Sequence, residues 1–343
     1  MSSELIFVTG ASGFLGAHIV DQLLNKGYRV RAAARGAKVD FLKHLYAQHK
    51  DHFDAVNISD IATGEFPEAL EGVDAVIHTA SPLPDKASKD VILEGAVNGT
   101  VNIIRQAQKA GIKRLIVTSS IASVSNPQKS FTDKDWNPLT REEALKGTDM
   151  ATYSVSKTLA ERALWDFAAQ HKELDITTLN PPFFYGPFAP GFTIPELNYG
   201  ALTTDAYIYR LLDPAGSYPS SPYYIDVRDV ARAHVAALTS PPESSVGRKR
   251  LLIASPYDSN FQGVVELIAA KRPELKNRLI TSKPPVFPSY KLPVDLKRVE
   301  DVLDIKVDSY KKWEETILDA VDSLIELENT WKAKGYNIVI PKA

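Results

Sequence analysis

Residues 5–16 read Leu-Ile-Phe-Val-Thr-Gly-Ala-Ser-Gly-Phe-Leu-Gly. The apolar beginning predicts a short buried strand, and apolar residues at helical spacing from Phe14 onward predict a helix. Between them stand Gly10, Gly13 and Gly16, where side chains would keep a phosphate away from the backbone N–H groups of a helix N-terminus. The stretch therefore predicts a strand, a turn and a helix that bind the pyrophosphate of a dinucleotide.

Composition narrows the classes of function. The chain has 343 residues, of which 44% are hydrophobic and 24% charged, so it is typical of globular proteins and long enough for two domains. A formal net charge of −2 favours neither nucleic acid nor an anionic membrane surface as a partner. The absence of cysteine excludes disulfides, thiolate metal sites and cysteine nucleophiles. With the first strand expected from Leu5 and no apolar run of membrane-spanning length, we expect a cytoplasmic protein without a signal peptide.

Strand and helix patterns alternate along the first half of the chain, which predicts a doubly wound parallel α/β sheet with helices on both faces. The further strands are expected at 28–34, 53–57, 75–78, 115–117, 176–179 and 250–254, and the further helices at 39–50, 89–110, 152–171, 260–270 and 309–334. The stretch 188–224, rich in Pro, Gly and Tyr, is typical of a loop that covers a substrate. We expect a Rossmann-type dinucleotide-binding domain of 1–190 with 224–256, and a smaller, mostly helical substrate-binding domain of 191–223 with 257–343.

The residues after the second expected strand indicate which dinucleotide binds. An NAD site of this type places an acidic residue there for the adenosine ribose, whereas this chain has Arg35. A guanidinium matches a 2′-phosphate in fork geometry, and Lys38 adds a second positive charge. The sequence therefore favours NADPH over NADH. Arg31 is a third candidate, and the alternative is that Arg35 only begins a solvated loop.

The carboxyl ends of parallel strands are where ligands bind in doubly wound sheets. The residues expected along the cofactor after the strand 75–78 are Thr79, Ala80 and Ser81. No carboxylate cluster accompanies His44, His49 and His52, so these histidines indicate a solvated helix face, and no metal site is expected.

Tyr153 and Lys157 stand four residues apart in the expected helix 152–171, so both side chains lie on one helix face. Carbonyl reduction by hydride requires a proton donor to the developing alkoxide. A nearby ammonium stabilises the phenolate and so lowers the pKa of the phenol toward neutral pH. Ser120, after the strand 115–117, supplies a hydroxyl for the substrate oxygen. The order of glycine turn, serine and Tyr-x-x-x-Lys predicts a catalytic site.

These motifs resemble those of the extended short-chain dehydrogenase/reductases, and within them the dihydroflavonol-4-reductase-like group, which includes fungal NADPH-dependent carbonyl, aldehyde and methylglyoxal reductases. The glycine turn with Thr9 is similar to their Thr-Gly-x-x-Gly-x-x-Gly pattern and departs from Gly-x-Gly-x-x-Gly. The resemblance extends through Arg35, 78–82, 117–120, Tyr153 with Lys157, 180–181, 186–187 and 225–231, and leaves out the tail.

The resemblance implies an NADPH-dependent carbonyl reductase with a Ser-Tyr-Lys mechanism. It also implies that Asp60 and Ile61 flank the adenine, although an Asp that caps the next turn is the alternative. Backbone groups of Pro181 and Phe184 would hold the nicotinamide carboxamide, and Lys157 the ribose hydroxyls. The expected cofactor-binding residues are Thr9, Gly10, Ser12, Gly13, Phe14, Leu15, Gly16, Arg35, Lys38, Asp60, Ile61, Thr79, Ala80, Ser81, Ser119, Tyr153, Lys157, Pro181 and Phe184.

The residues expected to bind the substrate are one serine and three tyrosines. Ser120 fits the catalytic serine of the family better than Ser119, which would then face the cofactor. Tyr185, Tyr223 and Tyr224 are candidates for the pocket wall, and the alternative is that they are aromatics of a domain interface.

Three other functions are compatible with this fold. A nucleotide-sugar epimerase or dehydratase resembles this chain but generally holds NAD with an acidic residue where Arg35 stands. A hydroxysteroid-type dehydrogenase would use the same chemistry. A dinucleotide-sensing regulator would bind the cofactor without turnover, and such relatives have typically lost the tyrosine that is present here as Tyr153. We expect a small carbonyl compound as the partner, with no nucleic acid, membrane or obligate protein partner.

Overall fold

The computed structural model describes residues 4–80, 88–125, 131–287 and 292–342. The chain divides into two compact units. The first consists of Met1–Pro181, Ala231–Ile253 and Pro293–Ile305, and the second of Pro182–Val230, Ala254–Leu292 and Lys306–Ala343. The return of 293–305 to the first unit is a feature that the sequence pattern did not indicate. The cofactor-binding and substrate-binding roles of the units remain proposals.

The first unit is built on a seven-stranded sheet, as far as the described residues show, with the order β3-β2-β1-β4-β5-β6-β9 and every neighbouring pair parallel. Its strands are β1 (Leu5–Thr9), β2 (Arg29–Ala34), β3 (Phe53–Asn57), β4 (Ala75–His78), β5 (Arg114–Thr118), β6 (Asp175–Asn180) and β9 (Lys249–Leu252). The central strands are runs of Val, Ile, Leu and Phe because helices cover both faces of a parallel sheet. The expected doubly wound α/β fold is confirmed.

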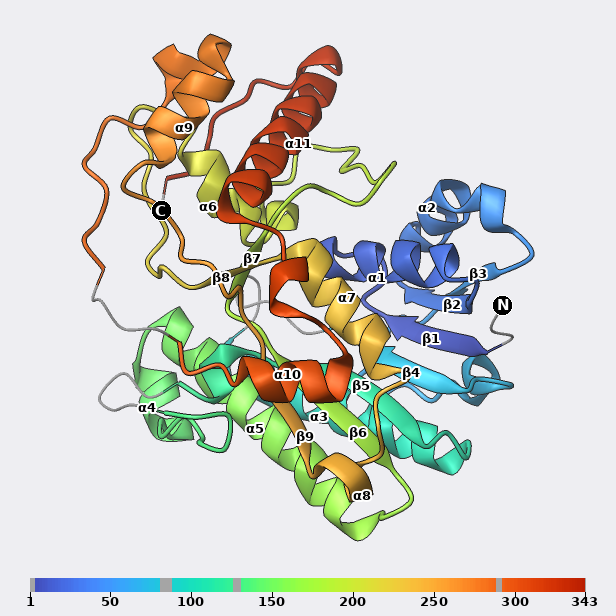
Figure 1. The fold of residues 1–343 in the computed structure, drawn as a ribbon. Helices are drawn as coiled ribbons and strands as arrows, with labels where there is room; N and C mark the ends of the chain where they lie inside the picture. The colour runs from blue at the N-terminus through green and yellow to red at the C-terminus, as the bar shows by residue number, and fades with distance from the viewer. Residues whose placement is uncertain (1–3, 81–87, 126–130, 288–291, 343) are drawn as a thin grey trace. The chain divides into compact units, whose positions relative to one another are not determined.

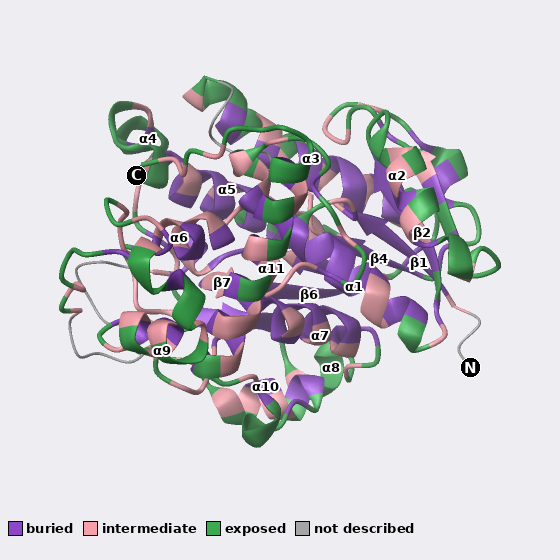
Figure 2. Ribbon diagram, turned by 90° about the horizontal axis from the view of Figure 1, so that it is seen from above, coloured by how far each residue is buried: buried purple, intermediate pink, exposed green. Residues whose placement is uncertain are grey.

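Helices cover both faces of this sheet. α3 (Lys89–Lys109) and α5 (Asp149–Gln170) pack on one face, where Ile103 and Leu164 join the apolar core under the strands. α1 (Phe14–Asn25) and α2 (Lys38–Leu45) lie on the other face (Figure 1). The remaining helices that lie wholly or partly in this unit are α4 (Arg141–Lys146), α7 (Val227–Ala237), α8 (Glu243–Val246) and α10 (Leu296–Leu303). Figure 2 shows the strands buried beneath helices whose outer faces are exposed.

The strand order changes direction between β1 and β4. From β1 the chain proceeds to β2 and β3 on one side, and then crosses to β4, β5, β6 and β9 on the other side. The register places Thr9 opposite His78, and His78 opposite Val117, so the carboxyl ends of β1, β4 and β5 are adjacent. Ligands of doubly wound sheets bind in the crevice outside this point.

The second unit has its own apolar core and a two-stranded parallel sheet of β7 (Phe183–Tyr185) and β8 (Tyr224–Asp226). Its helices are α6 (Asp205–Arg210), α9 (Val264–Lys271) and α11 (Trp313–Ala333). The expected loop 188–224 contains α6, which is only six residues long and too short to give a periodic signal. α9 begins later than expected because the side-chain oxygen of Asn260 accepts the Gly263 N–H and holds a turn before the helix.

Among the described residues, no helix combines the length and the apolar character that crossing a membrane requires.

Candidate active site

The glycine turn after β1 depends on its three glycines for different reasons. Gly10 has a φ of +71°, and a Cβ there would lie 2.8 Å from the Ala80 nitrogen and collide with the Thr79 side chain. A Cβ at Gly16 would collide with the Gly10 carbonyl. At Gly13 the nearest atom would be 3.2 Å away. Gly10 and Gly16 are therefore required by the turn itself, and only exposed Gly13 is left to serve a ligand, which refines the expectation that all three glycines serve the phosphates.

The start of α1 fits a pyrophosphate. Gly13 is the N-cap residue with extended backbone, and none of the described side chains caps the helix. The first N–H groups of a helix have no acceptor within the helix, and together with the helix dipole they attract an anion. Phe14 and Leu15 occupy the first turn of α1, with half-buried Ser12 just before it, as expected from the sequence.

The ends of β1 and β4 are tied together by side chains. The Thr9 hydroxyl lies 2.7 Å from His78 Nδ1, and the Thr79 hydroxyl donates to the Thr9 carbonyl at 2.8 Å. The Ala80 N–H donates to Thr9 Oγ1 at 3.4 Å. Burial and the positive charge of Lys157 lower the pKa of His78 to about 3, so its imidazole is neutral at ordinary pH. Expected Ser81 lies outside the described residues.

Arg35 and Lys38 are both exposed, at the carboxyl end of β2 and the first residue of α2. Gly36 between them has a φ of +53°, and its N–H donates to the Asn57 side chain at 3.0 Å, which fastens this turn to the end of β3. Both cations can therefore meet a 2′-phosphate at the surface. The third candidate, Arg31, instead donates to the Ala69 and Glu71 carbonyls at 3.0 and 2.9 Å, so it holds a loop.

Asp60 caps the turn that follows it, as the alternative expectation had it. Its carboxylate accepts from the Thr63 hydroxyl and, at 2.8 Å, from the Ala62 N–H. These hydrogen bonds, together with the nearby charge of Arg35, lower the pKa of Asp60. Ile61 is half-buried, and its carbonyl accepts from Asn102 at 3.0 Å. Both residues have local structural partners, and contact with an adenine stays a prediction.

The structure distinguishes the two serines after β5. Ser119 donates its hydroxyl to Glu161 Oε2 at 2.7 Å, so its side chain belongs to a buried polar network. Ser120 caps the short 3₁₀ helix Ile121–Ser123, and its Oγ accepts the Ala122 N–H at 3.1 Å. This bond occupies an acceptor site of Ser120 and leaves the hydroxyl proton for a substrate oxygen.

Tyr153 and Lys157 lie in the first half of α5, whose N-terminus is capped by the Thr148 hydroxyl. The Lys157 ammonium lies 6.0 Å from the centroid of the Tyr153 ring. Lys157 is buried, 9% exposed, while Tyr153 is half-buried. Because the charge of Lys157 acts on His78, the lysine belongs to the same end of the sheet as the glycine turn.

The remaining candidates lie at or beyond the end of β6. The Pro181 carbonyl accepts the Ile121 N–H at 2.9 Å, and the Phe184 carbonyl accepts the Thr204 hydroxyl. Tyr185 and Tyr224 are core residues of the second unit, 0% and 2% exposed, and the Tyr224 ring packs against Trp313. A substrate would have to open this core to reach them, and a place in the pocket wall stays a prediction for these two tyrosines. Half-buried Tyr223 remains a candidate.

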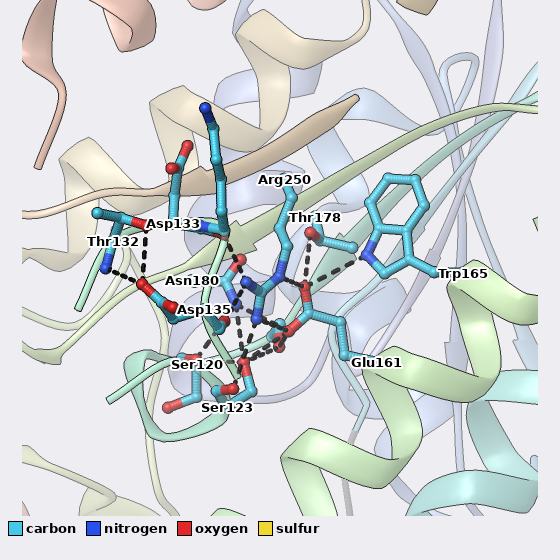
Figure 3. A network of polar contacts seen from close by, with 12 residues as sticks. Ser120, Ser123, Thr132, Asp133, Asp135, Glu161, Trp165, Thr178, Asn180 and Arg250 are labelled. Carbon is cyan, nitrogen blue, oxygen red and sulfur yellow. Dashed lines mark hydrogen bonds and ion pairs between the residues drawn. The ribbon is translucent and has the colours of Figure 1, made fainter. Parts of the chain in front are cut away.

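Glu161, Arg250 and the side chain of Asn180 were not predicted from the sequence as part of the site. These residues meet beneath Ser120 in one network (Figure 3). One signal was present: an arginine in an apolar strand of a sheet covered on both faces needs a carboxylate partner. Glu161, four residues after Lys157 on the same helix face, was the available carboxylate.

Comparisons with known proteins agree with this geometry. Residues 6–253 match the NAD dependent epimerase/dehydratase family. A putative NADPH-dependent methylglyoxal reductase of Candida albicans is 34% identical, over 94% of this chain and 99% of that protein. A putative uncharacterized oxidoreductase of Schizosaccharomyces pombe is 40% identical, over 74% of this chain and 78% of that protein. The crystal structure of the yeast methylglyoxal/isovaleraldehyde reductase Gre2 complexed with NADPH has a TM-score of 0.79 and 28% identity, over 95% of this chain and 99% of that chain.

Proposed function

Because the chain belongs to the NAD dependent epimerase/dehydratase family, we propose that it is an NADPH-dependent reductase of ketones or aldehydes. The family, the reductase class and the cofactor expected from the sequence are confirmed by the reductases to which the chain is similar. The roles of individual residues and the identity of the substrate are what is proposed here. The cytoplasmic location stays a prediction from the sequence.

One observation carries the proposal: the first unit alone holds the glycine turn, the serine with an available hydroxyl proton and the Tyr153–Lys157 pair. The turn at Gly13 fits the pyrophosphate and Arg35 the 2′-phosphate, and NADPH, when bound, supplies the hydride. Ser120 donates a hydrogen bond to the carbonyl oxygen, which stabilises the charge that develops there.

Tyr153 gives its phenolic proton to the alkoxide oxygen as general acid. The ammonium of Lys157 stabilises the resulting phenolate, because a positive charge beside a phenol favours the ionised form. Neutral His78 holds Thr9 at the end of β1 without adding a second positive charge near the lysine. The carbonyl oxygen is thus held by Ser120, in the turn after β5, and receives its proton from Tyr153 of α5.

The alternatives receive less support from the chain itself. An epimerase with NAD would be expected to have an acidic residue where Arg35 stands. A regulator without turnover has no use for Tyr153, Lys157 and Ser120 together. A hydroxysteroid-type dehydrogenase differs only in the substrate and becomes one outcome of the substrate test.

The test mixes purified protein with NADPH, and separately with NADH, and follows the loss of absorbance of the reduced nicotinamide. The panel contains aldehydes, diketones, ketoesters, flavanonols and ketosteroids. We expect selective consumption of NADPH with at least one carbonyl compound. Tight NADPH binding without consumption on any member of the panel would contradict the proposal and favour the regulator.

A further inference from the structure

A carboxylate and a guanidinium lie buried directly beneath the turn that carries Ser120. Arg250 Nε donates to Glu161 Oε1 at 2.8 Å, and the two side chains are 5% and 2% exposed. Glu161 comes from α5 and Arg250 from β9, which are far apart in the sequence. A buried ion pair of this kind is a poor source of stability, because desolvation of both charges offsets their attraction. Stability therefore does not account for this ion pair, and its place beside Ser120 suggests a role in positioning that residue.

Glu161 accepts hydrogen bonds from the turn after β5, from β6 and β9, and from Trp165 Nε1 of its own helix at 3.4 Å. Ser119, Ser123 and Asn180 donate to Oε2 at 2.7, 2.6 and 2.9 Å. Thr178 donates to Oε1 at 2.9 Å, in addition to Arg250. The carboxylate thereby fastens the ends of β5 and β6 to α5 (Figure 3). Although burial alone would raise it, Arg250 and the hydroxyl donors lower the pKa of Glu161, so the carboxylate stays charged.

The same donors hold the backbone of Ser120. Asn180 Nδ2 donates to the Ser120 carbonyl at 3.2 Å, and Ser123 Oγ lies 2.8 Å from that carbonyl, its single proton being shared between the carbonyl and Glu161 Oε2. Both side chains are themselves held by Glu161. Ser120 therefore sits between two groups whose positions depend on one carboxylate.

Arg250 extends the network to the segment after the serine turn. Its guanidinium donates to the Asp133 carbonyl and, at 2.6 Å, to the Asp135 carbonyl. It also stacks on Trp136, with its central carbon 3.8 Å from the ring centroid. Arg250 is thus fixed from several sides and in turn fixes Glu161.

We propose that Glu161, neutralised by Arg250, is a positioning residue that sets the Ser120 hydroxyl against the Tyr153–Lys157 face of α5. Tyr153, Lys157 and Glu161 follow one another at intervals of four residues, so they lie along one face of a rigid helix. Tyr153 and Lys157 stand on that helix, and Ser120 stands in the turn that follows β5. Glu161 is the link that couples the two, and misplacement by about 1 Å costs about 100-fold in rate.

The proposal rests on the reductase mechanism, and its test compares three altered proteins. Glu161→Gln removes the charge and keeps the shape. Glu161→Asp keeps the charge and shortens the reach. The double variant Glu161→Leu with Arg250→Met replaces the pair by apolar side chains, which avoids leaving a lone buried charge. Lys249→Met is the matched control, because Lys249 is 1% exposed, pairs with Asp175 at 2.7 Å and neighbours Arg250 on β9.

For each protein we would measure kcat and KM for the carbonyl compound, Kd for NADPH, the melting temperature, and amide hydrogen exchange at Ile121 and Ser123. These two amides donate to the Pro181 and Ser120 carbonyls at 2.9 and 3.0 Å, so they report the turn itself. We expect kcat to fall about 10- to 100-fold in all three Glu161 variants, with Kd for NADPH within about twofold, and exchange at both amides to accelerate. Lys249→Met should lose melting temperature and keep kcat.

The double variant decides between positioning and stability. If it melts near the wild-type temperature and still has a lowered kcat, the pair positions Ser120. If it recovers kcat to within about twofold of wild type, the pair is structural only and the proposal fails. Should Glu161→Gln not fold, Glu161→Asp and the double variant still give the answer. A wild-type protein that reduces no carbonyl would overturn the proposed function, whereas unchanged exchange at Ile121 and Ser123 would overturn the positioning role by itself.

Discussion

The two turns at the carboxyl end of the sheet are built in opposite ways. The turn after β1 is made of backbone: a positive φ at Gly10, close approaches that exclude side chains, and N–H groups at the start of α1. The turn after β5 is made of side chains, with Ser120 held by Asn180 and Ser123 and these held by a buried ion pair. Backbone N–H groups are enough to bind a phosphate, whose shape is constant. A substrate oxygen that gains charge during the reaction needs a hydroxyl held in place by neighbouring side chains. In the proposed mechanism the first turn binds the cofactor and the second places the hydroxyl that takes part in the reaction.

The largest expected effect separates these two tasks. Tyr153→Phe removes the proton donor and leaves the glycine turn untouched, so turnover should fall by about 1,000-fold. The Kd for NADPH should stay within about twofold, measured by fluorescence of the bound nicotinamide. Turnover that persists in this variant would contradict the assignment of Tyr153 as the proton donor, and with it the separate roles of the two turns.

The glycines test whether the first turn is made of backbone alone. Gly10→Ala should destabilise the protein by about 2–4 kcal/mol, because the alanine meets both a positive φ and the Ala80 nitrogen. Gly13→Ala brings its methyl group to 3.2 Å from the Gly10 carbonyl oxygen, a tight contact but one without a positive φ, so it should lose less stability than Gly10→Ala while raising Kd for NADPH about 10- to 100-fold. Chemical denaturation and cofactor titration measure the two quantities. Equal stability losses in both variants would show that the two glycines do not differ in role.

The neighbouring serines test the second turn in the same manner. Ser120→Ala should lower kcat about 100-fold, since it removes a hydrogen bond to the developing charge. Ser119→Ala removes a donor to Glu161 and should cost about 1–3 kcal/mol of stability with a smaller loss of kcat. Steady-state kinetics and thermal melts would be compared for both. A larger kcat loss in Ser119→Ala would exchange the two assignments.

The charge of Arg35, beyond the end of β2, tests the cofactor preference. Arg35→Asp should raise Kd for NADPH about 10- to 100-fold and change Kd for NADH much less. Arg31→Gln is the control, because Arg31 donates to the Ala69 and Glu71 carbonyls and should leave the NADPH to NADH ratio unchanged. Titration of both cofactors gives the ratios. If Arg31→Gln lost the preference for NADPH over NADH, the 2′-phosphate site would have to be assigned to Arg31 instead of Arg35.

His78, at the end of β4, contacts Thr9 beside the first turn and is buried near the charge of Lys157. Its pKa of about 3 in the folded protein lies below the ordinary value, so between about pH 6.5 and pH 3 only the unfolded chain binds this proton. The free energy of unfolding should therefore decrease by about 1 kcal/mol per pH unit as the pH falls through this window. His78→Asn should flatten that slope in melts from pH 7 to pH 4, and exposed His52→Asn should not. An unchanged slope in His78→Asn would contradict a buried neutral imidazole.

The contrast between the turns also explains what the sequence could reveal. Glycines required by backbone geometry stand close together in the chain, so the first turn was recognisable, and strands 53–57 and 75–78 were predicted with the bounds that the structure has. The network under Ser120 joins Glu161 to Arg250 across 89 positions, a spacing that no local pattern encodes. The strands β7 and β8, three residues each, are likewise defined only by pairing with each other across the chain.

The surroundings of Tyr185 and Tyr224 are likewise visible only in the folded chain. An aromatic residue has the same appearance in a sequence whether it lines a pocket or fills a core, and both of these tyrosines fill a core. Arg31 and Arg35 differ in the same way, because only the folded chain shows which guanidinium meets carbonyls and which stays at the surface.

The position of Arg250 on β9 has a consequence for biosynthesis. Translation proceeds at about 5–20 residues per second, so Glu161 leaves the ribosome roughly 4 to 18 s before the arginine that neutralises it. During that interval the carboxylate has no arginine partner, and burying it unpaired would cost several kcal/mol. A fragment that ends at Pro181 repeats this state permanently, since it contains the cofactor turn, Ser120 and Tyr153 but not β9. The network around Ser120 can thus be complete only after β9, in the last third of the chain, has been made.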